Sequence, residues 1–411
     1  MNTPTLRDDA RVIGLVSLAH GVSHFYHLIL AALFPWLKPA FNLSYAQLGL
    51  LMTLFFVVSG IGQALSGFVV DKAGARRVLF CGLALLGTSA LVLAGAQSYV
   101  MLAAGSMLAG LGNAVFHPAD YTLLNQRVSR ARIAHAFSLH GISGNLGWAA
   151  APAFLAGIAA LAGWRVALLS AAAIPFATLA LLFAQRAHLR ADPAPVHAAG
   201  TVQDSSFGFM KLPAVWMSFG FFFLTAIALG GIQSFSSASL VALYGISLAS
   251  ATTAYTAYML ASAAGMVLGG FLATRAQRHD RTIALSFVCA ALMALLVGAA
   301  VVPGWMAVVL MGGIGLAAGV AGPSRDLLIR AAAPKNATGR VFGIVYSGLD
   351  SGLALGPLLF GTMMDRGHPA WVFGCIALFQ VLAIGTALTV GGSSRSRDAS
   401  GAQASLNAGV R

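Results

Sequence analysis

The sequence predicts an all-α integral membrane protein with twelve transmembrane helices in two pseudo-symmetric six-helix bundles. Its 411 residues are 58% hydrophobic and 9% charged, with a mean hydropathy of +0.84, whereas roughly a quarter of the residues of a soluble domain are charged. A bilayer core of ~30 Å is crossed by ~20 apolar residues in a helix. Windows of that length recur twelve times between charged or turn-rich stretches, so a lipid bilayer is the expected environment of this chain.

Each window is expected to be helical because a bilayer offers no water to backbone groups, and the alternating pattern of a barrel strand is absent. Ser44 and Gln47 form a predicted capping box at the start of the second window. The three cysteines lie in separate windows, so neither a disulfide nor a thiolate metal site is indicated. The windows cover residues 12–37, 46–70, 77–97, 99–126, 132–160, 164–186, 212–243, 250–274, 282–302, 304–330, 338–364 and 369–391.

The basic residues predict the orientation of the chain. Lys38, Arg165 and Arg366 fall on one side of the predicted membrane, and the rest of the 24 basic residues fall on the other side or at its helix ends, apart from Arg325 within a window. By the positive-inside rule both termini are cytoplasmic. The net charge of +13 therefore reflects topology, and because the basic residues are dispersed over alternate loops, no nucleic-acid partner is expected.

An internal repeat and a polar interruption divide the chain. A shift of 205 residues places GLGNAVFHP (110–118) over GLAAGVAGP (315–323), and Gly67 corresponds to Gly270 at a shift of 203. Parallel repeats of this kind form a site at the midplane between two halves. We therefore expect an N-terminal six-helix bundle, a cytoplasmic linker, a C-terminal six-helix bundle and a disordered cytoplasmic tail, at residues 1–190, 191–210, 211–392 and 393–411.

The loop between the second and third windows reads GFVVDKAGARR. It resembles the cytoplasmic loop signature of the major facilitator superfamily, which implies the major facilitator fold and a gate at this loop. Glycines there permit close helix approach and a tight turn, while the charged residues can bond helix termini. The resemblance is carried by Gly67, Asp71, Gly74, Arg76 and Arg77.

Three further stretches are similar to the fosmidomycin-resistance branch of bacterial facilitator carriers. They read SHFYHLILAALFPWLK, AVFHPADYTLL and HAFSLHGISGNLGWAAAP. In that branch a Ser-His near the start, a Phe-His-Pro in the fourth span and a Gly-Asn-x-Gly in the fifth recur. The resemblance covers the first five spans and implies a proton-driven exporter in the bacterial inner membrane.

Polar side chains form a stripe along the fourth window. Asn113, His117 and Asp120 are spaced 0, +4 and +7, so they share one helix face, and Pro118 is expected to bend the span. His117 is expected to line a cavity. Asp120 has two interpretations: it shares a proton with His117, or it joins Arg127 in a gating salt bridge, because the acidic-x6-Arg spacing resembles that of sugar porters.

The second half carries its own charged residues within the windows. The repeat places Arg325 over Asp120 and Asp350 over Asn145, which inverts the charge between the halves. If Arg325 faces the cavity, its guanidinium can hold a carboxylate, phosphate or phosphonate through two hydrogen bonds. The alternative is structural, with Arg325 neutralising Asp326 or Asp350 near the cytoplasmic end.

Histidines His20, His24 and His27 stand at i, i+4 and i+7 in the first window and therefore share one helix face. They are expected to contact water, substrate or protons, with helix packing and metal binding as the alternatives. A metal is disfavoured because no carboxylate accompanies the three residues in the sequence. The resemblance runs through His24, and further candidates for this solute and proton pathway are His140 and Asn145 in the fifth window and Asp350 in the eleventh.

These observations predict a secondary active transporter that moves a small organic solute or drug by alternating access, with proton-coupled efflux. The alternatives are a proton-coupled importer of a small organic anion and a non-transporting membrane sensor. No G-x-x-x-x-G-K-[ST] loop is present, which excludes a self-contained ATP-driven pump. We expect no catalytic residues, no cofactor and no resident metal, and a monomer whose partners are a small-molecule substrate and protons.

Overall fold

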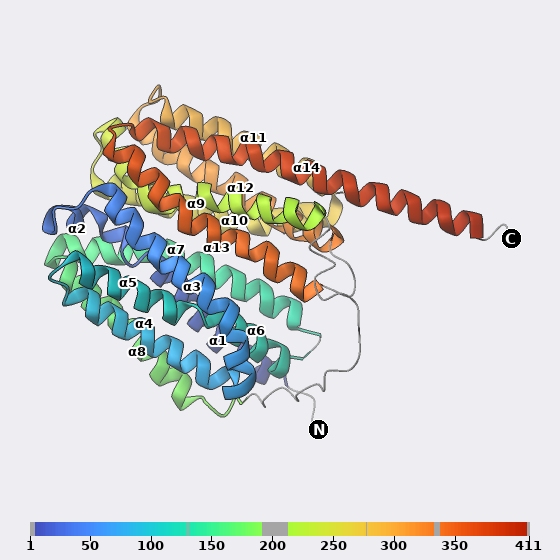
Figure 1. The fold of residues 1–411 in the computed structure, drawn as a ribbon, viewed down its shortest axis with the longest axis horizontal. Coiled ribbons are helices and arrows are strands. Elements are labelled where there is room, and N and C mark those ends of the chain that lie inside the picture. The colour runs from blue at the N-terminus through green and yellow to red at the C-terminus, as the bar shows by residue number, and fades with distance from the viewer. Residues whose placement is uncertain (1–4, 130, 191–212, 277, 333–337, 409–411) are drawn as a thin grey trace.

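The computed structural model describes residues 5–129, 131–190, 213–276, 278–332 and 338–408. Within these ranges the regular structure is helical (Figure 1). The helices are α1 (Leu6–His27), the short 3-10 helix η1 (Ala31–Leu33), α2 (Phe34–Ala40), α3 (Tyr45–Ala73), α4 (Ala75–Ala94), α5 (Tyr99–Asn113), α6 (Phe116–Arg127), α7 (Ile133–Ala162), α8 (Trp164–Ala184), α9 (Pro213–Tyr244), α10 (Leu248–Arg275), α11 (His279–Gly298), α12 (Gly304–Ala332), α13 (Thr338–Asp365) and α14 (Pro369–Ala408).

The helices fill the twelve span positions that the sequence predicts. Among the described residues, ten helical segments are long and apolar enough to cross a membrane, with α5 and α6 counted as one. A further span is bent by 45° where α1 gives way to η1 and α2. Helix α13 supplies the remaining position, packed against α3 and α9. The all-α membrane fold is therefore confirmed.

Two bundles of helices lie side by side, with both ends of the chain at the same end of the molecule (Figure 1). Helices α1 to α8, coloured blue to green, form one bundle, and α9 to α14, coloured yellow-green to red, form the other. The bundles meet along two seams, α3 with α13 and α7 with α10. We call the end that holds the termini the near end and the opposite end the far end.

Backbone contacts at glycines show the internal repeat in three dimensions. Gly110 of α5 lies against the backbone carbonyl of Phe55 on α3, and Gly315 of α12 lies against that of Tyr258 on α10. The two glycines are 205 positions apart and their partners 203, the two shifts that the sequence repeat predicts. A Cβ at either glycine would collide with the neighbouring carbonyl, so the same close helix approach is built twice.

The first turns of α3 join the two bundles at the far end. Ser44 and Gln47 form the predicted capping box. The backbone N–H groups of Tyr45 and Ala46 donate to the carboxylate of Asp365 on α13, both at 2.7 Å. Deeper along the seam, Thr53 Oγ1 donates to a carbonyl of α13 at 2.5 Å. Unpaired amides at a helix start are thus satisfied by the opposite bundle.

The C-terminal tail differs from the domain division that the sequence predicts, and the linker lies outside the part of the chain that the structure describes. The sequence composition predicts a disordered tail from residue 393, but in the structure α14 continues as a helix to Ala408 and projects beyond the bundle (Figure 1). The physical reason is that a segment extending an existing helix avoids the cost of nucleation. The predicted linker, 191–210, lies outside the described residues.

Candidate solute and proton pathway

A cavity of about 270 Å³ lies between the two bundles. Its N-terminal wall carries four imidazoles, those of His20, His24, His117 and His140. The opposite wall is mainly apolar and aromatic, and Arg325 stands in it. The sequence predicted cavity-lining roles for His20, His24, His27 and His117. Three of them line this cavity, and His27 is not among the lining residues.

The N-terminal wall is built around a buried carboxylate. Asp120 on α6 is fully buried. Its Oδ2 lies 3.1 Å from His140 Nε2 and 3.3 Å from His20 Nδ1, the first contact having hydrogen-bond geometry. The imidazoles of His20 and His140 stack, with ring centroids 3.5 Å apart. One carboxylate thus contacts two stacked imidazoles, an arrangement that can hold and transfer a proton beside the cavity.

Close packing of α1 on α7 brings these groups together. Gly147 of α7 lies against the backbone carbonyl of Gly21 on α1, so the two helices touch without intervening side chains. At Gly144, a Cβ would lie 2.7 Å from His24 Nδ1 and 3.2 Å from His20 Nε2. These two glycines therefore allow tight helix packing and also leave the space that the histidine rings occupy.

The fourth span breaks where the polar stripe begins. Helix α5 ends at Asn113 and α6 starts at Phe116, just ahead of Pro118 as predicted. Asn113 Nδ2 donates to Ser59 Oγ at 2.8 Å, and Asn113 Oδ1 lies 3.1 Å from His27 Nε2. The break thus places the amide of Asn113 between α1 and α3.

Both ring nitrogens of His27 have hydrogen-bond partners. Trp148 Nε1 donates to His27 Nδ1 at 3.2 Å. Because Nδ1 accepts, Nε2 carries the proton and donates to Asn113 Oδ1. His27 is therefore held as a neutral tautomer behind the cavity wall, which matches the helix-packing interpretation of this residue.

A second polar chain crosses from one bundle to the other. His117 Nδ1 lies 2.8 Å from Gln63 Oε1 on α3, and Gln63 Nε2 donates to Asp350 Oδ2 on α13 at 3.3 Å. Gln63 was not predicted, although a glutamine inside an apolar window is a visible signal. Asp350, predicted as a pathway residue, is connected through this chain to the cavity wall.

Two predicted pairings of Asp120 differ from the contacts observed. His117 was expected to share a proton with Asp120, but the imidazoles in contact with Asp120 are those of His20 and His140. The expected gating salt bridge between Asp120 and Arg127 also differs from what is observed: Arg127 Nε donates to the carbonyl of His188 at 3.2 Å. Helix spacing predicts a shared face, whereas partners on α1 and α7 are chosen by tertiary packing.

Arg325 and Asn145 also line the cavity. The Arg325 guanidinium carbon lies 4.9 Å from the centroid of the Phe222 ring, a cation–π distance. Arg325 is among the residues that line the cavity, and the side chain of Asp326, one of its expected partners, lies outside the described residues. Asn145 Nδ2 lies 2.8 Å from Met266 Sδ on α10, so this predicted residue contacts the opposite bundle.

The loop signature lies at the near end of the first bundle. Gly74 has a φ of +85° between α3 and α4, the left-handed backbone that glycine tolerates. Arg76 Nη1 donates to the carbonyl of Arg186 at 3.0 Å, which satisfies a carbonyl just beyond α8. Arg77 is exposed and Gly67 is half-buried, while the side chain of Asp71 lies outside the described residues.

Asp9 is a buried residue that sequence reasoning missed. Its carboxylate accepts hydrogen bonds from Ser129 Oγ and Arg132 Nε, both at 2.6 Å. The contacts join the start of α1 to the segment before α7. The sequence carried no signal for this role, because Asp9 lies in the polar, mixed-charge segment before the first window, where side chains are normally solvated.

The chain belongs to the Major Facilitator Superfamily, whose family model matches residues 16–324 and 221–408. It is similar to the fosmidomycin resistance protein of Escherichia coli K12, at 26% identity over 66% of each chain, just under two thirds. It is also similar to a probable nitrate transporter, NarT, of Staphylococcus aureus, at 25% identity over 33% of this chain and 35% of that protein.

The same architecture recurs in a solved structure. A bacterial homologue of the human lysosomal transporter Spinster, in an inward-facing and occupied conformation, superposes with a TM-score of 0.73. The match covers 95% of this chain and 97% of that one at 14% identity. At that identity the likeness concerns the fold, and it agrees with the two six-helix bundles described above.

Proposed function

We propose that this protein is a secondary active transporter that expels a small organic solute or drug across the bacterial inner membrane in exchange for protons. In this proposal residues 1–190 and 211–392 rock against each other about the central cavity. Both termini face the cytoplasm, as the distribution of basic residues favours, and the working unit is a monomer.

The observation that carries the proposal is the contact of Asp120 with His20 and His140 at the cavity wall. An ionisable group inside a membrane span is costly and needs a partner or a function. Asp120 is buried on the side of the cavity opposite Arg325. Protonation of this group would change the charge of the wall against which a solute binds, which supports coupling between proton and solute.

The chain from Asp350 through Gln63 to His117 supports coupling of that wall to movement. Its hydrogen bond between Gln63 and Asp350 joins the two bundles, so rocking must stretch or break it. The hydrogen-bonding state of His117 then depends on the conformation of the carrier. Similarity to the fosmidomycin resistance protein supports export and makes fosmidomycin, a phosphonate, the first solute to test.

The test is a pH-sensitive dye in everted membrane vesicles that contain the protein and an imposed proton gradient. Adding fosmidomycin or a panel of anionic and cationic drugs should release protons from the lumen. Vesicles without the protein are the control for drug effects on the membrane. A dye signal that remains identical with and without the protein across the panel would contradict the exporter proposal.

The rival function is import of a small organic anion with protons. It is favoured by Arg325, which is among the residues that line the cavity; a guanidinium can bind an anion through two hydrogen bonds. Similarity to a probable nitrate transporter also favours an anionic solute. Uptake of labelled anions into whole cells along an imposed proton gradient distinguishes import from export, because the two functions move the solute in opposite directions.

A further inference from the structure

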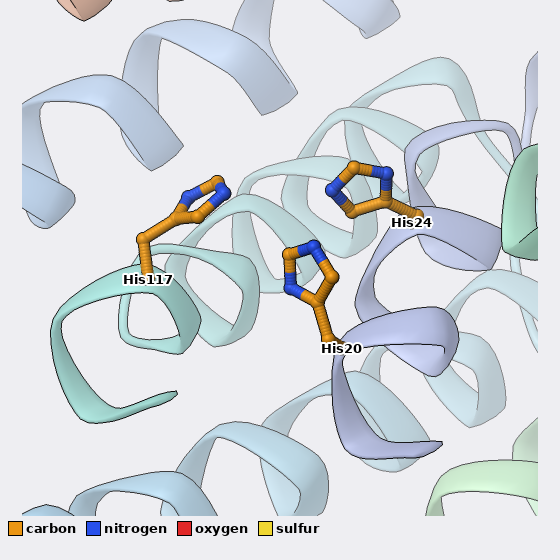
Figure 2. A group of neighbouring side chains, drawn as sticks. All are labelled: His20, His24 and His117. Atoms are coloured by element: carbon orange, nitrogen blue, oxygen red, sulfur yellow. The ribbon is translucent and has the colours of Figure 1, made fainter. Parts of the chain in front are cut away.

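We propose that His20, His24 and His117 form a binding site for a divalent transition-metal ion of the Zn²⁺ class on the wall of the central cavity. One nitrogen from each imidazole lies within 4.8 Å of the others. Figure 2 shows the three rings, two from α1 and one from α6, turned toward a common space. Imidazole nitrogen is a preferred ligand of Zn²⁺ and of neighbouring metals in its series. Metal binding does not require the proposed proton exchange and goes beyond it.

His24 is the residue that a metal would explain. Neither of its ring nitrogens has a hydrogen-bond partner among the described residues, although both atoms are buried. A buried polar atom without a partner costs free energy, and in a membrane span it indicates a ligand or a functional cavity. The missing side chain of Gly144 leaves room for the His24 ring, whose Nδ1 edge packs against the α7 backbone.

The hydrogen bonds of His117 set its tautomer for metal binding. Gln63 Nε2 donates to Asp350, which leaves Gln63 Oε1, an acceptor, to face His117 Nδ1. His117 Nδ1 must then carry the proton. The lone pair of His117 therefore lies on Nε2, available to a metal, in the manner of metal ligands whose second nitrogen is held by an outer group.

Asp120 lies behind His20 in the same way that Gln63 lies behind His117. Its carboxylate is 3.3 Å from His20 Nδ1 without hydrogen-bond geometry, and its negative charge favours a proton on that nitrogen and a lone pair on Nε2. A carboxylate behind a histidine orients the ring and makes it a better metal ligand. This corrects the sequence argument against a metal, which relied on the absence of a carboxylate: Asp120 is distant in sequence and the packing of α1 against α6 supplies it.

His27 is excluded as a ligand by the same reasoning, since Asn113 and Trp148 occupy both of its nitrogens. Three neutral imidazoles therefore face the cavity, and a fourth ligand position stays open for water or a solute. Zn–N bonds of about 2.0–2.1 Å in a tetrahedral site require nitrogens about 3.3 Å apart. Metal binding therefore requires the three rings to rotate toward one another from their present spacing of up to 4.8 Å.

The site is suited to reversible binding. None of the three cysteines contributes to it, and three neutral ligands hold a metal less firmly than thiolates do. The outer partner of His117 is tied to the opposite bundle through Asp350. Rocking of the bundles that breaks this bond frees the Gln63 amide to reorient, which weakens the orientation of one ligand and favours release.

The test uses the purified full-length chain in lipid nanodiscs, with an affinity tag that contains no histidine. Co²⁺ is titrated at about pH 7.5, where imidazole is neutral, and the absorption of nitrogen-coordinated Co²⁺ is recorded. Zn²⁺ is then added as a competitor. We expect one Co²⁺ per chain, displaced by Zn²⁺, and binding that weakens when the pH falls because protons compete for the same nitrogens.

The variants are His24→Ala, His24→Gln and His117→Ala, with His135→Ala as the matched control, an exposed histidine of α7 outside the cluster. We expect the three cluster variants to lower the affinity at least about tenfold, with His135→Ala unchanged. Monodisperse elution confirms that a variant is folded, and His24→Gln keeps a polar side chain if the alanine variant fails to fold.

Either of two results would overturn the proposal. One is no saturable Co²⁺ or Zn²⁺ binding up to about 1 mM, and the other is binding that folded His24 and His117 variants retain in full. The measurement involves no gradient and no drug. Its failure leaves the exporter proposal standing, and a silent dye assay in vesicles leaves the metal site standing.

Discussion

Replacement of Asp365 is expected to open the far end of the molecule. Its carboxylate accepts from the backbone N–H groups of Tyr45 and Ala46, both at 2.7 Å, and so ties α13 to the first turn of α3 across the two bundles. Alternating access requires the bundles to separate at this end when the near end closes. Asp365→Ala therefore removes contacts that stabilise the conformation closed at the far end and that are lost when the far end opens.

The size of the effect follows from the two bonds and their exposure. A side chain that satisfies amides at a helix start contributes about 0.5–2 kcal/mol, and a negative charge there adds about 0.3–1 kcal/mol at exposed sites. Asp365 is exposed, so solvent screening reduces the total to about 1–2 kcal/mol. Since about 1.4 kcal/mol is tenfold, the ratio of far-end-closed to far-end-open molecules should fall about 5–30-fold.

The assay is a pair of spin labels on the exposed far-end loop residues Gln97 and Val301, one in each bundle, in a background with the native cysteines replaced by serine. Pulsed electron spin resonance then gives the populations of short and long distances. Arg366→Ala, the adjacent exposed residue, is the matched control. An unchanged distance distribution in Asp365→Ala would refute the reasoning that these two hydrogen bonds hold the far end closed.

Three further predictions follow from the same contacts. Asp120→Asn should abolish drug-evoked proton release in everted vesicles while the protein stays folded, because the amide cannot carry the exchanged proton; retained release would remove Asp120 from the pathway. Gly147→Leu should destabilise the fold by about 1–3 kcal/mol through overpacking against α1, measured as a lower thermal unfolding temperature, while Gly141→Ala, whose Cβ meets open space, should not. Arg325→Gln should weaken responses to anionic drugs at least about tenfold, with cationic drugs unaffected; equal loss for both classes would contradict an anion-binding role.

The sequence predicted the spans and the repeat because membrane physics acts locally. A helix in lipid must satisfy its own backbone and present apolar side chains, so each span is visible in its own residues. The turn at Gly74 and the capping box at Ser44 were equally local and are present as predicted. The family resemblance of the loop signature is in accord with the family match.

The sequence also identified the four histidines and the arginine that line the cavity, since ionisable groups in a span are rare enough to stand out. It could not assign their partners. Helix periodicity puts Asp120 on one face with His117, but the residues that touch it, His20 and His140, lie 100 positions before and 20 positions after it in the chain. Which helices meet is decided by the backbone contacts at glycines such as Gly147.

What the sequence alone determined, then, is the class of protein, the number of spans, the repeat and a short list of polar residues within them. What the tertiary structure decided is which contacts these residues make: Asp120 contacts two imidazoles, Gln63 links His117 to the opposite bundle, and among the described residues neither ring nitrogen of His24 has a hydrogen-bond partner. The physical reason is that burial and helix formation depend on neighbours along the chain. The partner of a polar atom depends on the distance and angle between helices that are far apart in sequence.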